Sequence, residues 1–181
     1  MSIGSDAPGE VGAPLQEHGV VAALVRVWLP IAIVIGSITV LASRQARPIT
    51  DLDVWWHLRL GEEFRDGWAL ADPGSLSPFA TEPWVPTQWS LEILASYLVE
   101  WVGLGAVVWL TGLGVVLLGV ALWRGNREVA DPLAAAIATA AALAGTTPVL
   151  APRPQVASLV FLAVAATAWW ASSRDLGRGG G

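Results

Sequence analysis

Two residue types are missing from this sequence. Cysteine is absent, so neither a disulfide nor a thiolate site is available. Lysine is also absent, and the ten positive charges are all arginines, against fifteen acidic residues. The net charge of −5 leaves no basic patch of the kind that nucleic-acid binding requires, so we expect no nucleic-acid partner.

Charge of either sign is scarce. Only 14% of the residues are charged while 54% are hydrophobic, and the mean hydropathy is +0.57. A soluble domain would have to hide such long apolar stretches from water on every face, whereas a bilayer accommodates them directly. Arginine in place of lysine, with abundant alanine, is typical of a GC-rich bacterial genome. We therefore expect a multi-pass protein of the bacterial cytoplasmic (inner) membrane, with membrane lipid as its surroundings.

The hydropathy pattern predicts an all-α membrane protein with about four transmembrane helices and one or two interfacial helices in the first extracytoplasmic loop. The four transmembrane helices are expected at 20–42, 101–123, 132–150 and 156–171. The connecting loop with amphipathic helices is expected at 43–100, and flexible tails at 1–19 and 172–181.

The third predicted span is rich in alanine. Ala134, Ala138 and Ala142 lie four residues apart on one face, where small side chains let another helix approach closely. This span is therefore predicted to be a packing helix, and further membrane helices from another chain are candidate partners.

The arginines of the short loops predict the orientation. Arg124 and Arg127 lie between the second and third spans, and Arg174 and Arg178 follow the fourth. With four spans these residues share one side with the amino terminus, and the positive-inside rule makes that side cytoplasmic. The loop 43–100 is then extracytoplasmic.

The sequence DLDVWWHLRLG, at 51–61, begins a predicted helix from about Leu52 to Asp66. Thr50 and Asp53 have the spacing of a capping box, and Gly67 is well placed to end the helix. Arg59 is expected to pair with Glu62 or Glu63 on an exposed side.

Spacing by four puts Asp53, His57 and Gly61 on one face of that helix, where Gly61 leaves room for a ligand or for another backbone. Trp55 and Trp56 favour a position at the membrane surface, with their rings at headgroup level.

A second amphipathic helix is predicted from Gln88 and runs into the second span. Glu92, Ser96 and Glu100 occupy one side of it, near the outer membrane surface and close to Asp53. Its apolar stripe consists of Trp89, Ile93, Leu94, Tyr97, Leu98 and Trp101.

Each polar residue of this region has a structural alternative. Carboxylates at a helix start favour the helix dipole, which alone would explain Asp51 and Asp53. His57, without a second histidine or a cysteine, is a poor transition-metal ligand and is also explained as an interfacial polar residue. A hard divalent cation held by Asp51, Asp53 or Glu92 stays open, because such ions need oxygen ligands. Arg153, between the third and fourth spans, suits a phosphate or simply marks an interface.

Four stretches together carry a family resemblance. They are Asp51-Leu-Asp53-Val-Trp-Trp-His57-Leu-Arg-Leu-Gly61, Ser77-Pro-Phe-Ala-Thr81, Gln88-Trp-Ser-Leu-Glu92 and Arg153-Pro-Gln155. In this order they resemble landmarks of bacterial multi-pass proteins similar to the GT-C superfamily of polyprenyl-phosphate-sugar-dependent glycosyltransferases. The resemblance covers roughly residues 25 to 170. Such enzymes have eight or more spans, so the chain resembles their amino-terminal portion.

The resemblance implies the transfer of a sugar from a polyprenyl-phosphate donor to an acceptor hydroxyl at the extracytoplasmic face. An aspartate just after the first transmembrane helix is central to catalysis in that superfamily, and Asp53, or Asp51, matches it. Asp53 would act as general base, or with Asp51 would help to hold a divalent cation such as Mg²⁺ or Mn²⁺. His57 and Glu92 would orient groups around the site. Arg153 and Gln155 would bind the lipid phosphate.

Two functions therefore stand side by side. The first is a GT-C-like membrane glycosyltransferase or its amino-terminal part. The alternative is a non-catalytic integral membrane protein, either a truncated relic or an accessory subunit that packs with other membrane helices.

Overall fold

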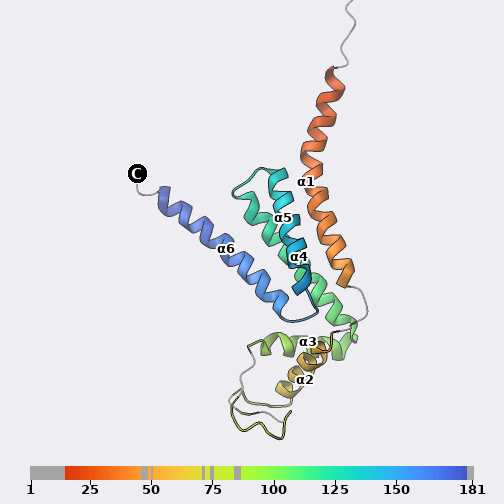
Figure 1. Cartoon of the computed structure of the whole chain (residues 1–181), viewed down its shortest axis with the longest axis vertical. Helices are drawn as coiled ribbons and strands as arrows, with labels where there is room; N and C mark the ends of the chain where they lie inside the picture. The colour runs from red at the N-terminus through yellow and green to blue at the C-terminus, as the bar shows by residue number, and fades with distance from the viewer. Residues whose placement is uncertain are drawn as a thin grey trace, which may run out of the picture.

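The computed structural model is α-helical throughout the part of the chain that it describes, which comprises residues 15–45, 49, 51–70, 72–73, 76–83 and 87–178. These ranges contain six α-helices and one short 3₁₀ helix, and no β-strand (Figure 1). The predicted all-α fold class is confirmed.

Four of the helices are long and apolar: α1 (Leu15–Gln45), α4 (Gly105–Arg127), α5 (Pro132–Thr146) and α6 (Gln155–Arg178). The segments long and apolar enough to cross a membrane are Ala22–Gln45, Gly105–Arg127, Pro132–Val149 and Gln155–Arg174. Many of their large apolar side chains face outward, where lipid solvates them and water would not. Length and composition are thus those of a multi-pass membrane protein with four spans.

The long helices alternate in direction, so the chain connections fall at two ends. The start of α1 and the end of α6 lie at one end together with the turn between α4 and α5 (Figure 1). The opposite end carries the end of α1, the start of α4 and the turn between α5 and α6. Polar residues from distant parts of the sequence therefore meet at this second end.

Two shorter helices, α2 (Asp53–Arg65) and α3 (Trp89–Val102), pack against each other across that second end (Figure 1). Val54 and Leu58 of α2 and Val107 of α4 form a small buried cluster that attaches the two helices to the bundle. Burial of apolar side chains is the main source of this attachment.

Glycines on α4 allow its neighbours to approach closely. A Cβ at Gly114 would lie 2.4 Å from Val156 of α6, and one at Gly119 would lie 2.5 Å from Ile38 of α1. Close approach through small residues is the usual means by which membrane helices pack. The main buried cluster lies beside these contacts and comprises Leu41, Val115, Leu118, Leu143, Leu150 and Val156.

Helix α5 does pack, but on a different stripe from the one predicted. Ala134 and Ala138 are exposed, whereas Ala135 and Thr139 are fully buried. The hydroxyl group of Thr139 accepts a hydrogen bond from the Asn126 side chain at 3.1 Å. In an alanine-rich helix several stripes are equally small, so side-chain size alone does not determine which one is buried.

The second predicted span differs from the structure at its start. The prediction joined residues 101–123 to the preceding amphipathic helix, but α3 ends at Val102 and α4 begins at Gly105. Gly103 lies between them with a φ of +79°, a conformation that glycine adopts at little cost. The chain therefore turns sharply, and α3 lies across the end of the bundle instead of extending α4.

Both predicted tails are shorter in the structure. Residues 1–14 lie outside the described residues, but 15–19 belong to α1, and 172–178 continue α6. The guanidinium group of Arg174 donates to the carbonyl oxygen of Glu128 at 2.6 Å and lies over the Trp170 ring. These contacts hold the last turns of α6 against the turn that follows α4.

Candidate functional site

The stretch DLDVWWHLRLG forms the start of α2, which begins at Asp53 and ends at Arg65. The Asp51 carboxylate accepts a hydrogen bond from the backbone N–H of Asp53 at 3.1 Å, which satisfies one of the unpaired donors of the first turn. Thr50, the predicted cap, lies outside the described residues. At the other end the chain leaves the helix through Gly67, at a φ of +105°.

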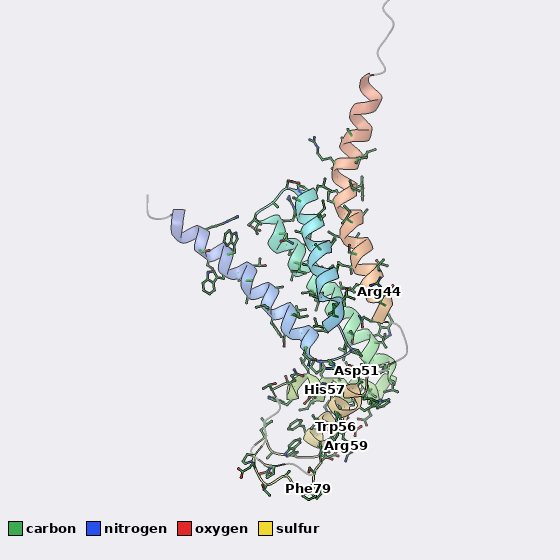
Figure 2. All side chains as sticks on the ribbon, in the orientation of Figure 1. Arg44, Asp51, Trp56, His57, Arg59 and Phe79 are labelled. Atoms are coloured by element: carbon green, nitrogen blue, oxygen red, sulfur yellow. The ribbon has the colours of Figure 1, made fainter. Side chains whose placement is uncertain are left out.

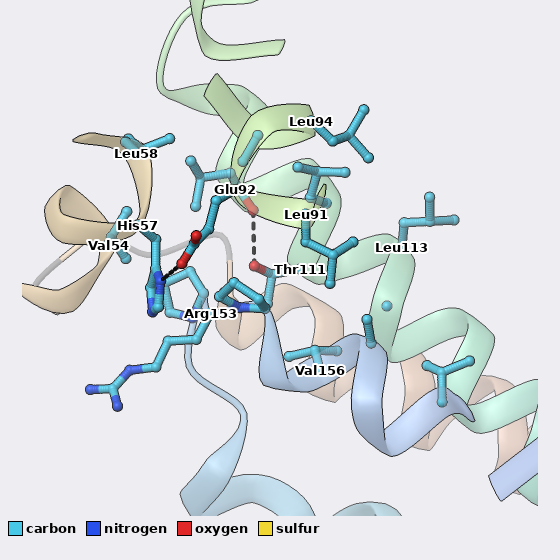
Figure 3. Close-up of a pocket in the computed structure, with 18 of the residues that line it drawn as sticks. Val54, His57, Leu58, Leu91, Glu92, Leu94, Thr111, Leu113, Arg153 and Val156 are labelled. Atoms are coloured by element: carbon cyan, nitrogen blue, oxygen red, sulfur yellow. Dashed lines mark hydrogen bonds and ion pairs between the residues drawn. The ribbon is translucent and has the colours of Figure 1, made fainter. Parts of the chain in front are cut away.

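Gly61 allows a close backbone contact between α2 and α3. A Cβ there would lie 2.1 Å from the backbone oxygen of Glu92, so the space left by this glycine is filled by another backbone and not by a ligand. The contact brings the two helices together one turn away from His57. The Nδ1 atom of His57 then lies 2.8 Å from the Oε1 atom of Glu92 (Figure 3).

Helix α3 buries the first two residues of its predicted polar side, whereas the third, Glu100, is exposed. The Glu92 and Ser96 side chains are almost completely buried, whereas Trp89, Tyr97 and Trp101 of the predicted apolar stripe are exposed. Exposed tryptophans and tyrosines on one side of a helix are typical of a helix at a membrane surface. The carboxylate of Glu92 therefore points into the protein.

Arg153 links the turn between α5 and α6 to the start of α2. Its Nε atom donates to Asp51 Oδ2 at 2.6 Å and its Nη2 atom to Asp51 Oδ1 at 3.0 Å. The same Nη2 atom lies 2.8 Å from Oδ2 of Asp53. A bidentate guanidinium–carboxylate pair of this kind fixes orientation as well as distance. One arginine thus holds both aspartates of the DLD sequence.

The ion pair shifts the pKa values of both its members. The hydrogen bond from Arg153 lowers the pKa of the Asp51 carboxyl below its ordinary value of 3.8, although partial burial opposes this effect. The hydrogen bond to Asp51 also raises the pKa of Arg153. Both groups are therefore charged at neutral pH.

An apolar pocket of about 300 Å³ extends from these polar groups between α4 and α6 (Figure 3). Its polar side chains are His57, Glu92, Thr111 and Arg153. The apolar lining includes Leu91, Leu94, Leu113, Leu117, Val160 and Phe161. The volume is at the lower end of the range for small-molecule pockets, and an apolar wall with a few polar groups at one end suits an amphipathic molecule.

The candidate residues of the sequence meet at this one end, although Gln155 takes no part in the contacts described above. Asp51 and His57 lie where α2 faces the long helices, while Phe79 is at the distant tip of the following loop (Figure 2). Gln155 is the exposed first residue of α6 and does not line the pocket. The apolar lining residues gave no signal in the sequence, because a leucine facing a pocket and a leucine facing lipid look alike.

The two aspartates predicted to hold a metal ion are engaged by an arginine. Within the described residues no group of three or more histidine, aspartate or glutamate side chains could hold one. Asp51 and Asp53 are both paired with Arg153, and a cation would have to displace this guanidinium group. The metal role suggested for these two aspartates therefore remains a prediction, and the sugar transfer proposed for the chain is written without a metal.

Within the described residues, four helices are long and apolar enough to cross a membrane, as expected of a helical multi-pass membrane protein. Comparisons with protein-family models, curated proteins and solved structures found no match for the chain.

Proposed function

We propose that the chain is a GT-C-like glycosyltransferase of the bacterial cytoplasmic membrane, or the amino-terminal part of one, as the residues of the DLD sequence and of the Arg153 turn imply by resemblance. The observation that carries the proposal is the pairing of Asp53 with Arg153, whose Oδ2 and Nη2 atoms lie 2.8 Å apart, and Arg153 also lines the apolar pocket. The two residues to which the proposal gives the catalytic and phosphate-binding roles are thus neighbours, although 100 positions separate them in the sequence.

The proposed reaction uses a polyprenyl-phosphate sugar as donor. The acceptor hydroxyl loses its proton to the Asp53 carboxylate, and its oxygen bonds to the anomeric carbon as the bond from that carbon to the carrier phosphate breaks. Arg153 stabilises the negative charge on the departing phosphate, because a guanidinium group suits phosphate oxygens. Asp53 is about half exposed, so an acceptor has access to it. Asp51, His57 and Glu92 orient these groups.

Replacement of Asp53 tests the reaction. Loss of a general base typically costs about 10² to 10⁴ in rate, so Asp53→Asn should reduce sugar transfer by at least about 100-fold. Transfer is measured in nanodiscs, with labelled pentoses and hexoses on short-chain polyprenyl phosphates. Asp66→Asn is the matched control, because Asp66 is an exposed carboxylate at the other end of α2. Equal transfer by both variants would remove Asp53 from the mechanism.

The proposed orientation has α2 and α3 on the extracytoplasmic side. The chain contains no cysteine, so single-cysteine variants report their own location. Ser77→Cys, in the loop after α2, should react with a membrane-impermeant maleimide in intact cells. Glu128→Cys, in the exposed turn after α4, should react only after the membrane is permeabilised. The reverse pattern would exclude transfer at the outer face.

The second candidate is a non-catalytic membrane protein that packs with other membrane helices. One observation favours it: Arg153 is already paired with both Asp51 and Asp53, so neither the guanidinium group nor the carboxylates are free. Absence of transfer from every donor, together with co-purification of another membrane protein, would support this function.

A further inference from the structure

The carboxylate of Glu92 is satisfied on one oxygen only. Its Oε1 atom is paired with His57, but its Oε2 atom is buried and has no hydrogen-bond partner within the described part of the chain. The side chain is only 2% exposed, so water does not serve as a general substitute. Buried acceptors of this kind normally have a donor, and an unpaired one calls for a missing group.

Glu92 is also one of the residues that line the apolar pocket. We infer that this pocket binds a neutral amphiphile, a single apolar chain that ends in a hydroxyl group, and that on binding the Glu92 carboxylate turns toward the pocket, so that the hydroxyl donates a hydrogen bond to Oε2. This ligand is distinct from the lipid phosphate of the proposed reaction, and its binding does not require sugar transfer.

The polar groups of the pocket select the headgroup. The Thr111 hydroxyl already donates to the carbonyl oxygen of Val107 at 2.8 Å, and Arg153 is engaged by two aspartates. What the pocket lacks is therefore a donor for Glu92. A phosphate would bring a second negative charge beside this carboxylate, and an ammonium group has three N–H donors to satisfy, whereas the unpaired Glu92 Oε2 needs only one. A hydroxyl meets the requirement with one donor.

The pocket walls select the rest of the ligand. Beyond the polar end the lining is leucine, valine and phenylalanine from α3, α4 and α6. A flexible hydrocarbon chain gains favourable contact with such a surface, whereas a sugar or a peptide would leave its own polar groups unpaired there. The pocket of about 300 Å³ has room for one chain of moderate length.

Decanol and decyl methyl ether are the probes, because they share the chain but only decanol donates a hydrogen bond. Saturable binding of each is measured with the full chain in nanodiscs. A hydrogen bond to a charged group changes affinity by about tenfold or more, so the native chain should prefer decanol by about that factor. Decyl phosphate, the third probe, should bind more weakly than decanol.

Glu92→Gln provides the sharpest variant. Glutamine keeps the size and the acceptor for His57 but replaces the free oxygen by an NH₂ donor, so the preference for decanol over the ether should disappear. Glu62→Gln, at an exposed carboxylate of α2, should retain the preference. Asp53→Asn should abolish transfer without changing the ratio, which separates this inference from the proposed function.

Three results would overturn the inference. They are equal binding of decanol and the ether by the native chain, an unchanged preference in Glu92→Gln, and tighter binding of decyl phosphate than of decanol. The first comparison needs no variant, so it stands even if Glu92→Gln does not fold.

Discussion

The contact between α2 and α3 can be broken by one methyl group. In Gly61→Ala the new Cβ would lie 2.1 Å from the Glu92 carbonyl oxygen and 2.6 Å from its carbon, whereas ordinary contact begins at 3.4 Å. The two helices must therefore separate by about 1.3 Å, the difference between the first and last of these distances. Because the obstacle is backbone, no change of rotamer relieves the clash.

The size of the effect follows from two opposing contributions. Overpacking costs about 1 to 3 kcal/mol, and the rigid obstacle justifies the upper value. Alanine in place of glycine stabilises the helix itself by about 1 kcal/mol. We expect a net loss of about 2 kcal/mol in the packing of α2 on α3, which corresponds to about 30-fold more frequent opening.

Hydrogen exchange measures this opening directly. The amides of α2 and α3 should exchange about 30-fold faster in Gly61→Ala, since local opening and exchange are linked. Preference for decanol over its ether should also fall, because the displaced segment carries Glu92. Gly112→Ala is the matched control: its Cβ meets nothing within 4 Å, so exchange should stay the same or slow down. Native exchange rates in Gly61→Ala would refute the close backbone contact.

Further perturbations test two other contacts, the ion pair of Asp51 with Arg153 and the packing of Gly125 against Thr167. Asp51→Asn keeps an acceptor for the Asp53 N–H but removes the charged pair with Arg153, so exchange in the turn after α5 should rise at neutral pH. In the native chain the same protection should be lost only in acid. Because folding lowers the pKa of Asp51, its ion pair with Arg153 contributes fully above pH 3.8 and is lost as the pH falls through the lower pKa of the folded state. Gly125→Ala puts a Cβ 2.6 Å from Thr167 Oγ1 and should lower the thermal midpoint in detergent; Thr167→Ala should restore it, and no rescue would contradict this packing of α4 on α6.

Local patterns in the sequence were sufficient for the helices. A long apolar run becomes a helix in a membrane because every backbone N–H and C=O must be paired within it, so the four long helices follow from hydropathy alone. The start of α2 is similarly local, because the Asp51 carboxylate pairs with a backbone N–H two residues away. The predicted partners of Arg59 are also confirmed, since Glu62 and Glu63 lie within one turn of it.

These patterns did not predict which face of each helix is buried. An amphipathic period shows that α3 has a polar and an apolar side, but it does not say which side meets protein when lipid is the alternative surrounding. The structure buries Glu92 and exposes Trp101. The buried stripe of α5 was likewise undetermined, because alanines surround the whole helix.

The candidate site depends on both the sequence and the tertiary structure. Sequence determined which residue types were available, a DLD pair, a histidine, a glutamate and an arginine between two apolar spans. Only the tertiary structure decided that Arg153 reaches Asp51 across 102 positions, and that Glu92 turns its carboxylate inward to His57. The reason is physical: spacing along a helix fixes neighbours within a few turns, whereas contacts between helices depend on how apolar faces and glycines pack together.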